Sequence, residues 1–388
     1  MSTDLQPNDS ANRQLQEKVH PADWPTKPDS NGYDFIAIGG GTAGLVASAG
    51  AAMLGARVAL IERNMLGGDC LVTGCVPSKA LIHASRIANT IRNAPNYGIK
   101  CGPINVDFPQ VMKKLRQIRA EVASDDSAST VSSRGIDTIF GDARFTSPNT
   151  LEVDGTEISF KRAIICTGGR ATIPPIPGLT EADPLTNESV FNLTELPPRL
   201  AIIGGGPIGC ELGQAMARLG SKVTLFEVMD RILNIIDIEA GAIIEDQLKT
   251  DGVNILAKSQ IVSVTPSENS WQINYTHDNS TQSVIVDKIL VAAGRAPNIE
   301  HLNLEVANVA YNKKGVTIDS YQRTSNKRIY AAGDVSNAYK FTHSAYAYAE
   351  YATLNALLPI PLYNTKKLIM PFSVYEVDPE NWTGGLVG

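Results

Sequence analysis

Two glycine-rich turns, each following a short apolar segment, constrain the fold of this chain more than any other feature. The apolar pattern predicts a buried strand over residues 33–39, a turn over 39–44, a helix over 45–54 and a second strand over 57–62. The same order returns further along the chain, with a strand over residues 200–203, a turn over 204–209, a helix over 210–219 and a strand over 222–227. Because the first glycines of the two turns are 165 positions apart, each unit has room for its own domain, and we expect an α/β fold.

Both turns have the spacing GxGxxG, and an acidic residue closes the next strand 23 positions after the first glycine. The glycines permit a tight turn, a close approach of the backbone to a pyrophosphate and packing of the helix on the strand, and the carboxylate can accept from ribose hydroxyls. The alternative is that the turns only reverse the chain. The predicted dinucleotide-binding residues are Gly39, Gly41, Gly44 and Glu62, and Gly204, Gly206, Gly209 and Glu227.

The second turn also bears on which nicotinamide cofactor it would take. Glu227 would repel a 2′-phosphate and accept from a 2′-hydroxyl, which favours NADH over NADPH. Arg231, four positions further on, could reach a phosphate and weakens this preference.

The most specific feature is the segment GGDCLVTGCVPSK, in which Cys70 and Cys75 are five positions apart. On a regular helix five residues rise about 7.5 Å, which exceeds the Cα separation of about 7 Å that a disulfide can bridge. If the sulfurs join, the helix must therefore be interrupted, and Gly74 would relax the backbone. Pro77 suits the first turn of the following helix, so Cys75 lies near a helix N-terminus, where the field favours the thiolate.

Three interpretations of this pair remain open: a redox dithiol, a zinc site and two inert thiols. A zinc site would need His83 and Cys101, at spacings that fit no common finger, and we expect no metal site. We assign Cys101, Cys166 and Cys210 structural roles and His343 a packing role.

Charge and hydropathy exclude other classes of protein. With 34 Lys and Arg against 40 Asp and Glu, the net charge of −6 gives no basic footprint for nucleic acid. The sequence has no apolar run of about 18 residues for a membrane span and no signal peptide at residues 1–10, so we expect a cytoplasmic protein. Residues 1–31 are polar, with four prolines that should interrupt any helix, and predict a tail that carries no chemistry.

Taken together, these motifs resemble the flavin-dependent pyridine nucleotide-disulfide oxidoreductases, among them dihydrolipoamide dehydrogenase, glutathione reductase and mercuric reductase. The resemblance covers residues 33–361, and the CxxxxC segment, which ends in VPSK, is most similar to mercuric reductase-like members. Further signatures are Thr167-Gly168, Gly294-Arg295 with Pro297-Asn298, and Gly333-Asp334.

The resemblance implies two Rossmann-like three-layer domains, of which the FAD domain is discontinuous in sequence. The implied divisions are a polar tail (1–31), an FAD-binding part (32–175), an NAD(P)-binding domain (176–298), a second FAD-binding part (299–362) and a remnant of a dimerisation domain (363–388).

By the same resemblance, a hydride passes from NAD(P)H through FAD to the Cys70-Cys75 disulfide and on to a thiol, disulfide or metal-ion acceptor. Cys75 would face the flavin as the charge-transfer thiolate, and Cys70 would attack the substrate. Lys79 and Glu211 would form an ion pair beside flavin N5, and Asp334 would contact its ribityl-diphosphate arm. Further implied cofactor-binding residues are Gly68, Lys79, Thr167, Gly168, Gly294, Arg295 and Gly333.

The chain departs from this family near its C-terminus. Only residues 370–380 resemble the start of the dimerisation domain, and the His-Glu pair and the cysteine pair expected beyond it are missing. We therefore expect a C-terminally truncated member of a homodimeric family. The predicted function is that of a mercuric reductase-like enzyme. Two alternatives stay open: a dihydrolipoyl dehydrogenase-like activity, and an inactive protein that binds flavin and nucleotide.

Overall fold

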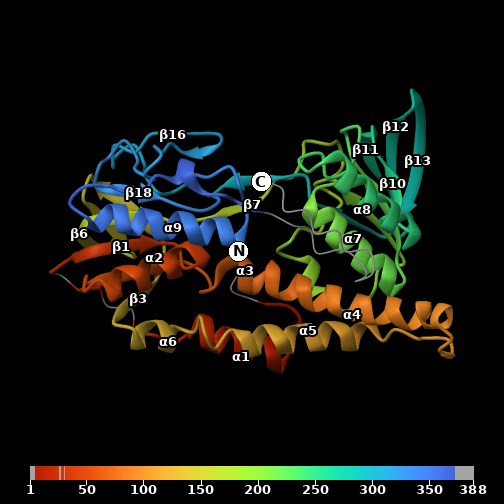
Figure 1. The fold of residues 1–388 in the computed structure, drawn as a ribbon, viewed down its shortest axis with the longest axis horizontal. Helices are drawn as coiled ribbons and strands as arrows, with labels where there is room; N and C mark the ends of the chain where they lie inside the picture. The colour runs from red at the N-terminus through yellow and green to blue at the C-terminus, as the bar shows by residue number, and fades with distance from the viewer. Residues whose placement is uncertain (1–4, 26–27, 30, 372–388) are drawn as a thin grey trace. The chain divides into compact units, whose positions relative to one another are not determined.

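The computed structural model describes residues 5–25, 28–29 and 31–371, and these residues form two units (Figure 1). The chain crosses from unit 1 to unit 2 between Gly74 and Cys75, inside the CxxxxC segment. Both units contain parallel strands joined by helices, which confirms the predicted α/β class. Of the described residues, unit 1 contains 5–25, 28–29, 31–74, 119–170 and 295–370, and unit 2 contains 75–118, 171–294 and 371.

A seven-stranded sheet forms the centre of unit 1. Its order is β3-β2-β1-β6-β5-β4, and β18 pairs with β6. The pairs that join β3, β2, β1, β6 and β18 are parallel, whereas β5 pairs antiparallel with both β6 and β4. The strands are β1 (Tyr33–Ile38), β2 (Val58–Glu62), β3 (Ile136–Phe140), β4 (Ala143–Ser147), β5 (Thr150–Val153), β6 (Thr156–Ile165) and β18 (Ile329–Ala331).

Helices cover this sheet, and the composition of α2 explains how closely it lies on the strands. Eight of the twelve residues of α2 are Ala, Gly or Ser, and the helix packs against α9 (Figure 1). The helices are α1 (Ser10–Val19), α2 (Thr42–Met53), α3 (Gly68–Val72), α6 (Ala128–Ser133) and α9 (Thr342–Leu357). Short elements complete the unit: β15 (Arg295–Pro297), β16 (Tyr311–Asn312), β17 (Gly315–Val316) and η3 (Thr365–Lys367).

Unit 2 combines a parallel sheet of order β10-β9-β8-β14 with an antiparallel sheet of order β11-β12-β13. Its strands are β8 (Arg199–Ile203), β9 (Lys222–Phe226), β10 (Asn254–Leu256), β11 (Gln260–Ser267), β12 (Ser270–His277), β13 (Ser280–Val286) and β14 (Lys288–Val291). Its helices are α4 (Cys75–Asn93), η1 (Ala94–Tyr97), η2 (Val190–Asn192), α7 (Pro207–Leu219) and α8 (Ile238–Thr250).

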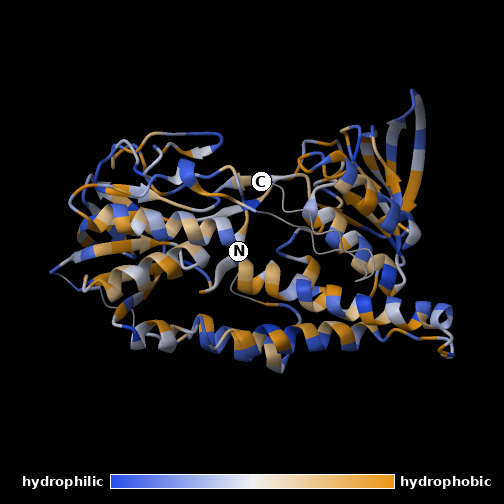
Figure 2. Cartoon of the chain, viewed as in Figure 1, coloured by the Kyte–Doolittle hydropathy of each residue, from blue (hydrophilic) through white to orange (hydrophobic). Residues whose placement is uncertain are grey.

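Two elements run across the division between the units. They are α5 (Phe108–Val122) and β7 (Gly169–Ala171). Hydrophobic and hydrophilic residues alternate along α5, as expected for a helix with one buried side (Figure 2). Among the helices that the structure describes, none is long and apolar enough to cross a membrane.

The N-terminal segment differs from its prediction. Prolines were expected to interrupt any helix there, but α1 forms between Pro7 and Pro21. The side chain of Asp9 caps it, accepting from the Asn12 N–H at 2.9 Å. Leu15 and Val19 are fully buried, so α1 is held by packing against unit 1.

In unit 2, a buried ion pair joins the end of α7 to the end of α8, and its removal should be costly. Arg218 and Asp251 lie 2.8 Å apart with side chains 3% exposed. Asp251→Asn should lower the free energy of unfolding by about 3 kcal/mol, because it leaves a buried guanidinium without its counter-charge. Urea denaturation of the variant and the wild type measures this difference in the free energy of unfolding. As control, Glu245→Gln breaks the more exposed Glu245–Lys249 pair and should cost less than about 0.5 kcal/mol. Equal effects of the two variants would contradict the prediction.

Candidate functional site

The first glycine turn connects β1 to α2 and leaves no room for side chains. Gly39 has a φ of +105°, and a Cβ on Gly44 would lie 1.7 Å from the Gly39 carbonyl oxygen. Gly41 is the N-cap of α2, so the N–H groups of the first helical turn face outward past a residue without a side chain. This arrangement fits the diphosphate of a dinucleotide such as FAD.

Glu62 ties the next strand to this turn. Its carboxylate accepts from the Gly40 N–H at 2.5 Å and from the Asn64 N–H at 2.6 Å. Burial raises the pKa of Glu62, while these two N–H donors act in the opposite direction. The Glu62 carboxylate, which is predicted to contact a ribose, therefore also fixes the turn. It does so through Gly40, which is not among the predicted binding residues.

The second turn, between β8 and α7, repeats this geometry. Gly204 has a φ of +114°, and a Cβ on Gly209 would lie 2.0 Å from the Gly204 carbonyl oxygen. Glu227 accepts from the Gly205 N–H at 2.7 Å and from the Met229 N–H at 2.9 Å. Each unit thus contains a turn suited to one dinucleotide.

In unit 1, other predicted residues gather at the edge where the parallel strands end. Thr167 and Gly168 follow β6, and Gly333 and Asp334 follow β18, so both turns lie beside the turn after β1. In α/β sheets this edge is where ligands bind. Thr167 is held by Asn298: the Thr167 hydroxyl donates to the Asn298 carbonyl at 2.6 Å, and the Asn298 amide donates to the Thr167 carbonyl at 2.9 Å.

Arg295 connects this edge to residues 67–79, which contain Cys70 and Cys75 and are called the redox segment here after their predicted role. Its guanidinium pairs with Asp334 at 2.9 Å, donates to the Gly169 carbonyl at 2.6 Å and forms an ion pair with Asp69. Burial alone would lower the pKa of Arg295, but the two carboxylates raise it overall. Sequence reasoning missed Asp69, although a carboxylate directly before Cys70 was a visible signal.

The redox segment is interrupted as its spacing predicted. Cys70 lies on the five-residue helix α3 of unit 1, and Cys75 is the first residue of α4 in unit 2. Gly74 lies between the two helices, and a Cβ there would come within 2.6 Å of the Asp69 carbonyl oxygen. Both cysteines are half-buried, and Pro77 lies in the first turn of α4.

Lys79 and Glu211 form an ion pair in unit 2, with 2.7 Å between Lys79 Nζ and a Glu211 carboxylate oxygen. The Glu211 side chain is 9% exposed. The pair joins α4, one turn after Cys75, to α7, which begins at the second glycine turn. Its position relative to a flavin stays a prediction.

The other cysteines differ from this pair in their surroundings. Cys166 and Cys210 are buried, and burial raises the pKa of the Cys166 thiol. Cys101 is exposed, as is His83. Within residues 5–25, 28–29 and 31–371, no three His, Cys, Asp or Glu side chains form a group that could hold a metal ion.

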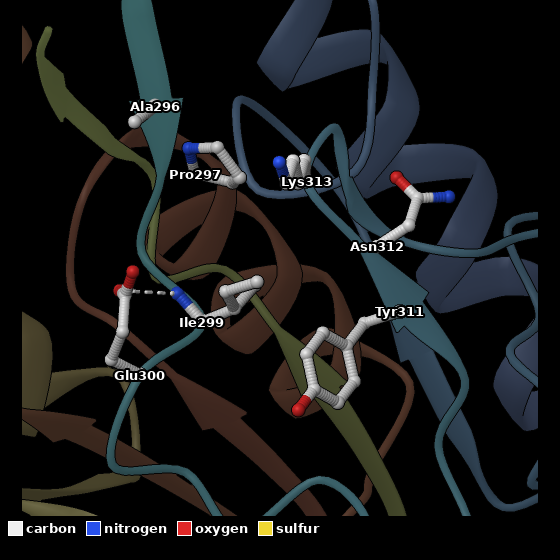
Figure 3. Close-up of a pocket in the computed structure, with 7 residues that line it drawn as sticks. All are labelled: Ala296, Pro297, Ile299, Glu300, Tyr311, Asn312 and Lys313. Carbon is white, nitrogen blue, oxygen red and sulfur yellow. Dashed lines mark hydrogen bonds between the residues drawn. The ribbon is translucent and has the colours of Figure 1, made fainter.

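A pocket of about 410 Å³ lies beside β15 in unit 1 (Figure 3). Its walls include Pro297 and Tyr311, and Glu300 on its rim is paired with Arg170 at 2.8 Å. That ion pair lowers the pKa of Glu300. None of the residues predicted to bind a cofactor lines this pocket.

Each unit of the fold contains a glycine turn suited to a dinucleotide, and a cysteine pair lies where the chain passes from α3 to α4. A profile of the pyridine nucleotide-disulphide oxidoreductases matches residues 33–349. The chain belongs to this family, which is FAD-dependent and uses NAD(P)H as electron donor.

Three relatives illustrate the similarity. A mercuric reductase of Bacillus cereus is 36% identical over 84% of this chain, and the chain spans 52% of its length. A dihydrolipoyl dehydrogenase of Acholeplasma laidlawii is 31% identical over 81% of this chain and 94% of its own length. The structure of the HOCl-induced flavoprotein disulfide reductase RclA from Escherichia coli matches with a TM-score of 0.78 and 29% identity, over 88% of this chain and 75% of that one. The chain thus covers about half of the mercuric reductase.

The tight packing of the first turn gives a test of FAD binding. Gly44→Ala should abolish FAD binding, because the new methyl group would collide with the Gly39 carbonyl. Gly50→Ala, in the same helix, is the matched control: its Cβ would meet only a Thr353 methyl group at 3.6 Å. The flavin bound per chain after purification, from the visible spectrum, is the measurement. Full flavin occupancy in Gly44→Ala would contradict the assignment.

Proposed function

We propose that this chain is an oxidoreductase that takes electrons from NADH and reduces an acceptor through the Cys70-Cys75 disulfide. The observation that carries the proposal is the interrupted helix of the redox segment, with Cys75 opening α4 one turn before the Lys79–Glu211 pair. The names of the relatives suggest two acceptor classes, the mercuric ion and the lipoyl disulfide, which is the oxidised form of the dihydrolipoyl group.

Unit 1 offers the residues that would hold FAD. The turn after β1 would take the diphosphate, with Glu62 at the ribose, and Asp334, held by Arg295, would face the ribityl-diphosphate arm. When bound, FAD accepts a hydride from NAD(P)H and supplies the electron pair that reduces a disulfide. Cys75 is the first residue of α4, where the field at the helix N-terminus would favour its thiolate, and the Lys79–Glu211 pair follows one turn later.

The two cysteines then carry the exchange chemistry. The Cys70 thiolate attacks one sulfur of a substrate disulfide, forms a mixed disulfide and releases the other sulfur as a thiolate. The Cys75 thiolate attacks Cys70 Sγ, which re-forms the Cys70-Cys75 bond and releases the second substrate thiolate. The released thiolates take up protons from water, so two electrons leave the cysteine pair and reduce one substrate disulfide.

The preference for NADH rests on how Arg231 is engaged. Its guanidinium donates to the carbonyl oxygens of Leu233 at 3.0 Å, Asn234 at 3.0 Å and Ile236 at 2.7 Å, so it is bound to its own loop. Glu227, whose carboxylate accepts from the Gly205 N–H of the turn, would accept from a 2′-hydroxyl and repel a 2′-phosphate.

Substitution of either redox cysteine tests the proposal. Cys70→Ser and Cys75→Ser should lower NADH-driven reduction of a disulfide, such as lipoamide, by at least about 10³-fold, because the exchange loses its nucleophile. NADH-driven reduction of a quinone dye, which needs no thiol, should persist. Cys101→Ser, at an exposed cysteine, should leave both activities unchanged.

Two outcomes would contradict the proposal. Disulfide reduction that survives in both variants would exclude the pair as the reactive group. A wild-type protein that binds flavin but reduces neither acceptor would favour the alternative of a nucleotide-binding protein without turnover.

The nucleotide preference has its own test. The wild type should favour NADH over NADPH by about tenfold or more in kcat/KM, a difference of about 1.4 kcal/mol. Arg231→Met should leave the ratio within about twofold, because its guanidinium is already committed to three carbonyl groups. A selective loss of NADPH activity in Arg231→Met would show that the arginine binds the 2′-phosphate instead.

A further inference from the structure

The N-terminal segment of residues 9–24, here called the strap, contacts unit 1 on both sides of the redox helix α3. At the entry to α3, the Leu66 N–H donates to the Val19 carbonyl at 3.1 Å. Further along, the Trp24 indole N–H donates to the Thr138 carbonyl at 3.0 Å. Figure 1 shows α1 beside α6 and the C-terminal end of α5. The strap is thus attached at several points.

The contact at the exit of α3 passes through one buried side chain. Arg119 is 1% exposed, and its guanidinium donates to the Val72 carbonyl at 2.7 Å and to the Asn12 side-chain oxygen at 2.7 Å. Val72 is the last residue of α3, where carbonyl groups lack partners within the helix. Asn12 is itself 2% exposed and donates to the Pro7 carbonyl at 2.8 Å. One strap residue therefore fixes the arginine that caps the redox helix.

α3 needs such support because it is too short to hold itself. Five residues form little more than one turn, and isolated helices of fewer than about 12 residues are marginal in water. Gly67 and Gly68 at its start have φ values of +86° and +53°, and Gly74 follows its end. The direction in which Cys70 points therefore depends on tertiary contacts at the two ends of α3.

We propose that Asn12 of the strap is a positioning residue for Cys70, acting through Arg119 and the Val72 carbonyl to hold α3 in the orientation that favours the Cys70-Cys75 disulfide. The inference rests on the proposed function of that pair. A disulfide forms only over a narrow range of geometry, so a loosened α3 lowers the effective concentration of one thiol at the other and shifts the equilibrium toward the dithiol.

The test compares three full-length variants with the wild type in glutathione redox buffers, with the thiols counted by alkylation after acid quenching. Asn12→Ala should lower the equilibrium constant for disulfide formation at least about threefold, which is about 14 mV at 29.6 mV per factor of ten. Asn12→Asp keeps an oxygen for Arg119 and should restore the wild-type value. Lys18→Met is the matched control: it removes two strap contacts, to the Ala120 carbonyl and Ser124, but leaves Asn12 and Arg119 in place.

Urea denaturation of the same variants separates positioning from stability. Lys18→Met should lower the free energy of unfolding without moving the redox equilibrium. Equal redox shifts in Asn12→Ala and Lys18→Met, or no shift in a folded Asn12→Ala, would overturn the inference. If Asn12→Ala does not fold, Asn12→Leu keeps the side-chain volume and removes the acceptor, and the same threefold criterion applies. A wild type without a reversible disulfide would instead overturn the proposed function, and the inference with it.

Discussion

Both units depend on the close approach of a helix to the strand that precedes it. At Gly44 and Gly209 the backbone leaves no space for a single methyl group, so the helix begins directly beyond the carboxyl end of the strand. The N–H groups of the helix are then gathered at one edge of the sheet, and the carboxylates of Glu62 and Glu227 fix the same edge from the neighbouring strand. In unit 1 the turns after β6 and β18 lie at this same edge, because both strands run parallel to β1.

The sequence predicted the parts of the fold that depend on local constraints. Glycine spacing and apolar periodicity identified both turns and their strands, because the steric requirement lies within a few residues. Helix starts were predicted late: α2 begins at Thr42 and α7 at Pro207, each three residues before the expected start. The reason is physical, since the last residues of the turn are already the first residues of the helix, and Pro207 has no N–H that the helix would need there.

Long-range contacts explain what could not be predicted. α1 exists because Leu15 and Val19 are buried against unit 1, whereas the flanking prolines, read locally, argued against any helix. Asp69 and Arg295 are 226 positions apart, and no local pattern relates them. Arg119 lies on the buried side of α5, where periodicity predicts an apolar residue. Its hydrogen bonds to Val72 and Asn12 therefore could not be predicted from the sequence of the helix.

The redox segment combines both kinds of information. Its own sequence sets the spacing of the cysteines, the interruption at Gly74 and the start of α4, all of which are local. The orientation of α3 is not local, because a five-residue helix between glycines has little rigidity of its own. Arg295 restrains it at Asp69, and Arg119 restrains it at the Val72 carbonyl. The cysteine motif can therefore be recognised from the sequence alone, whereas the restraints on α3 come from residues that lie far from Cys70 in the sequence.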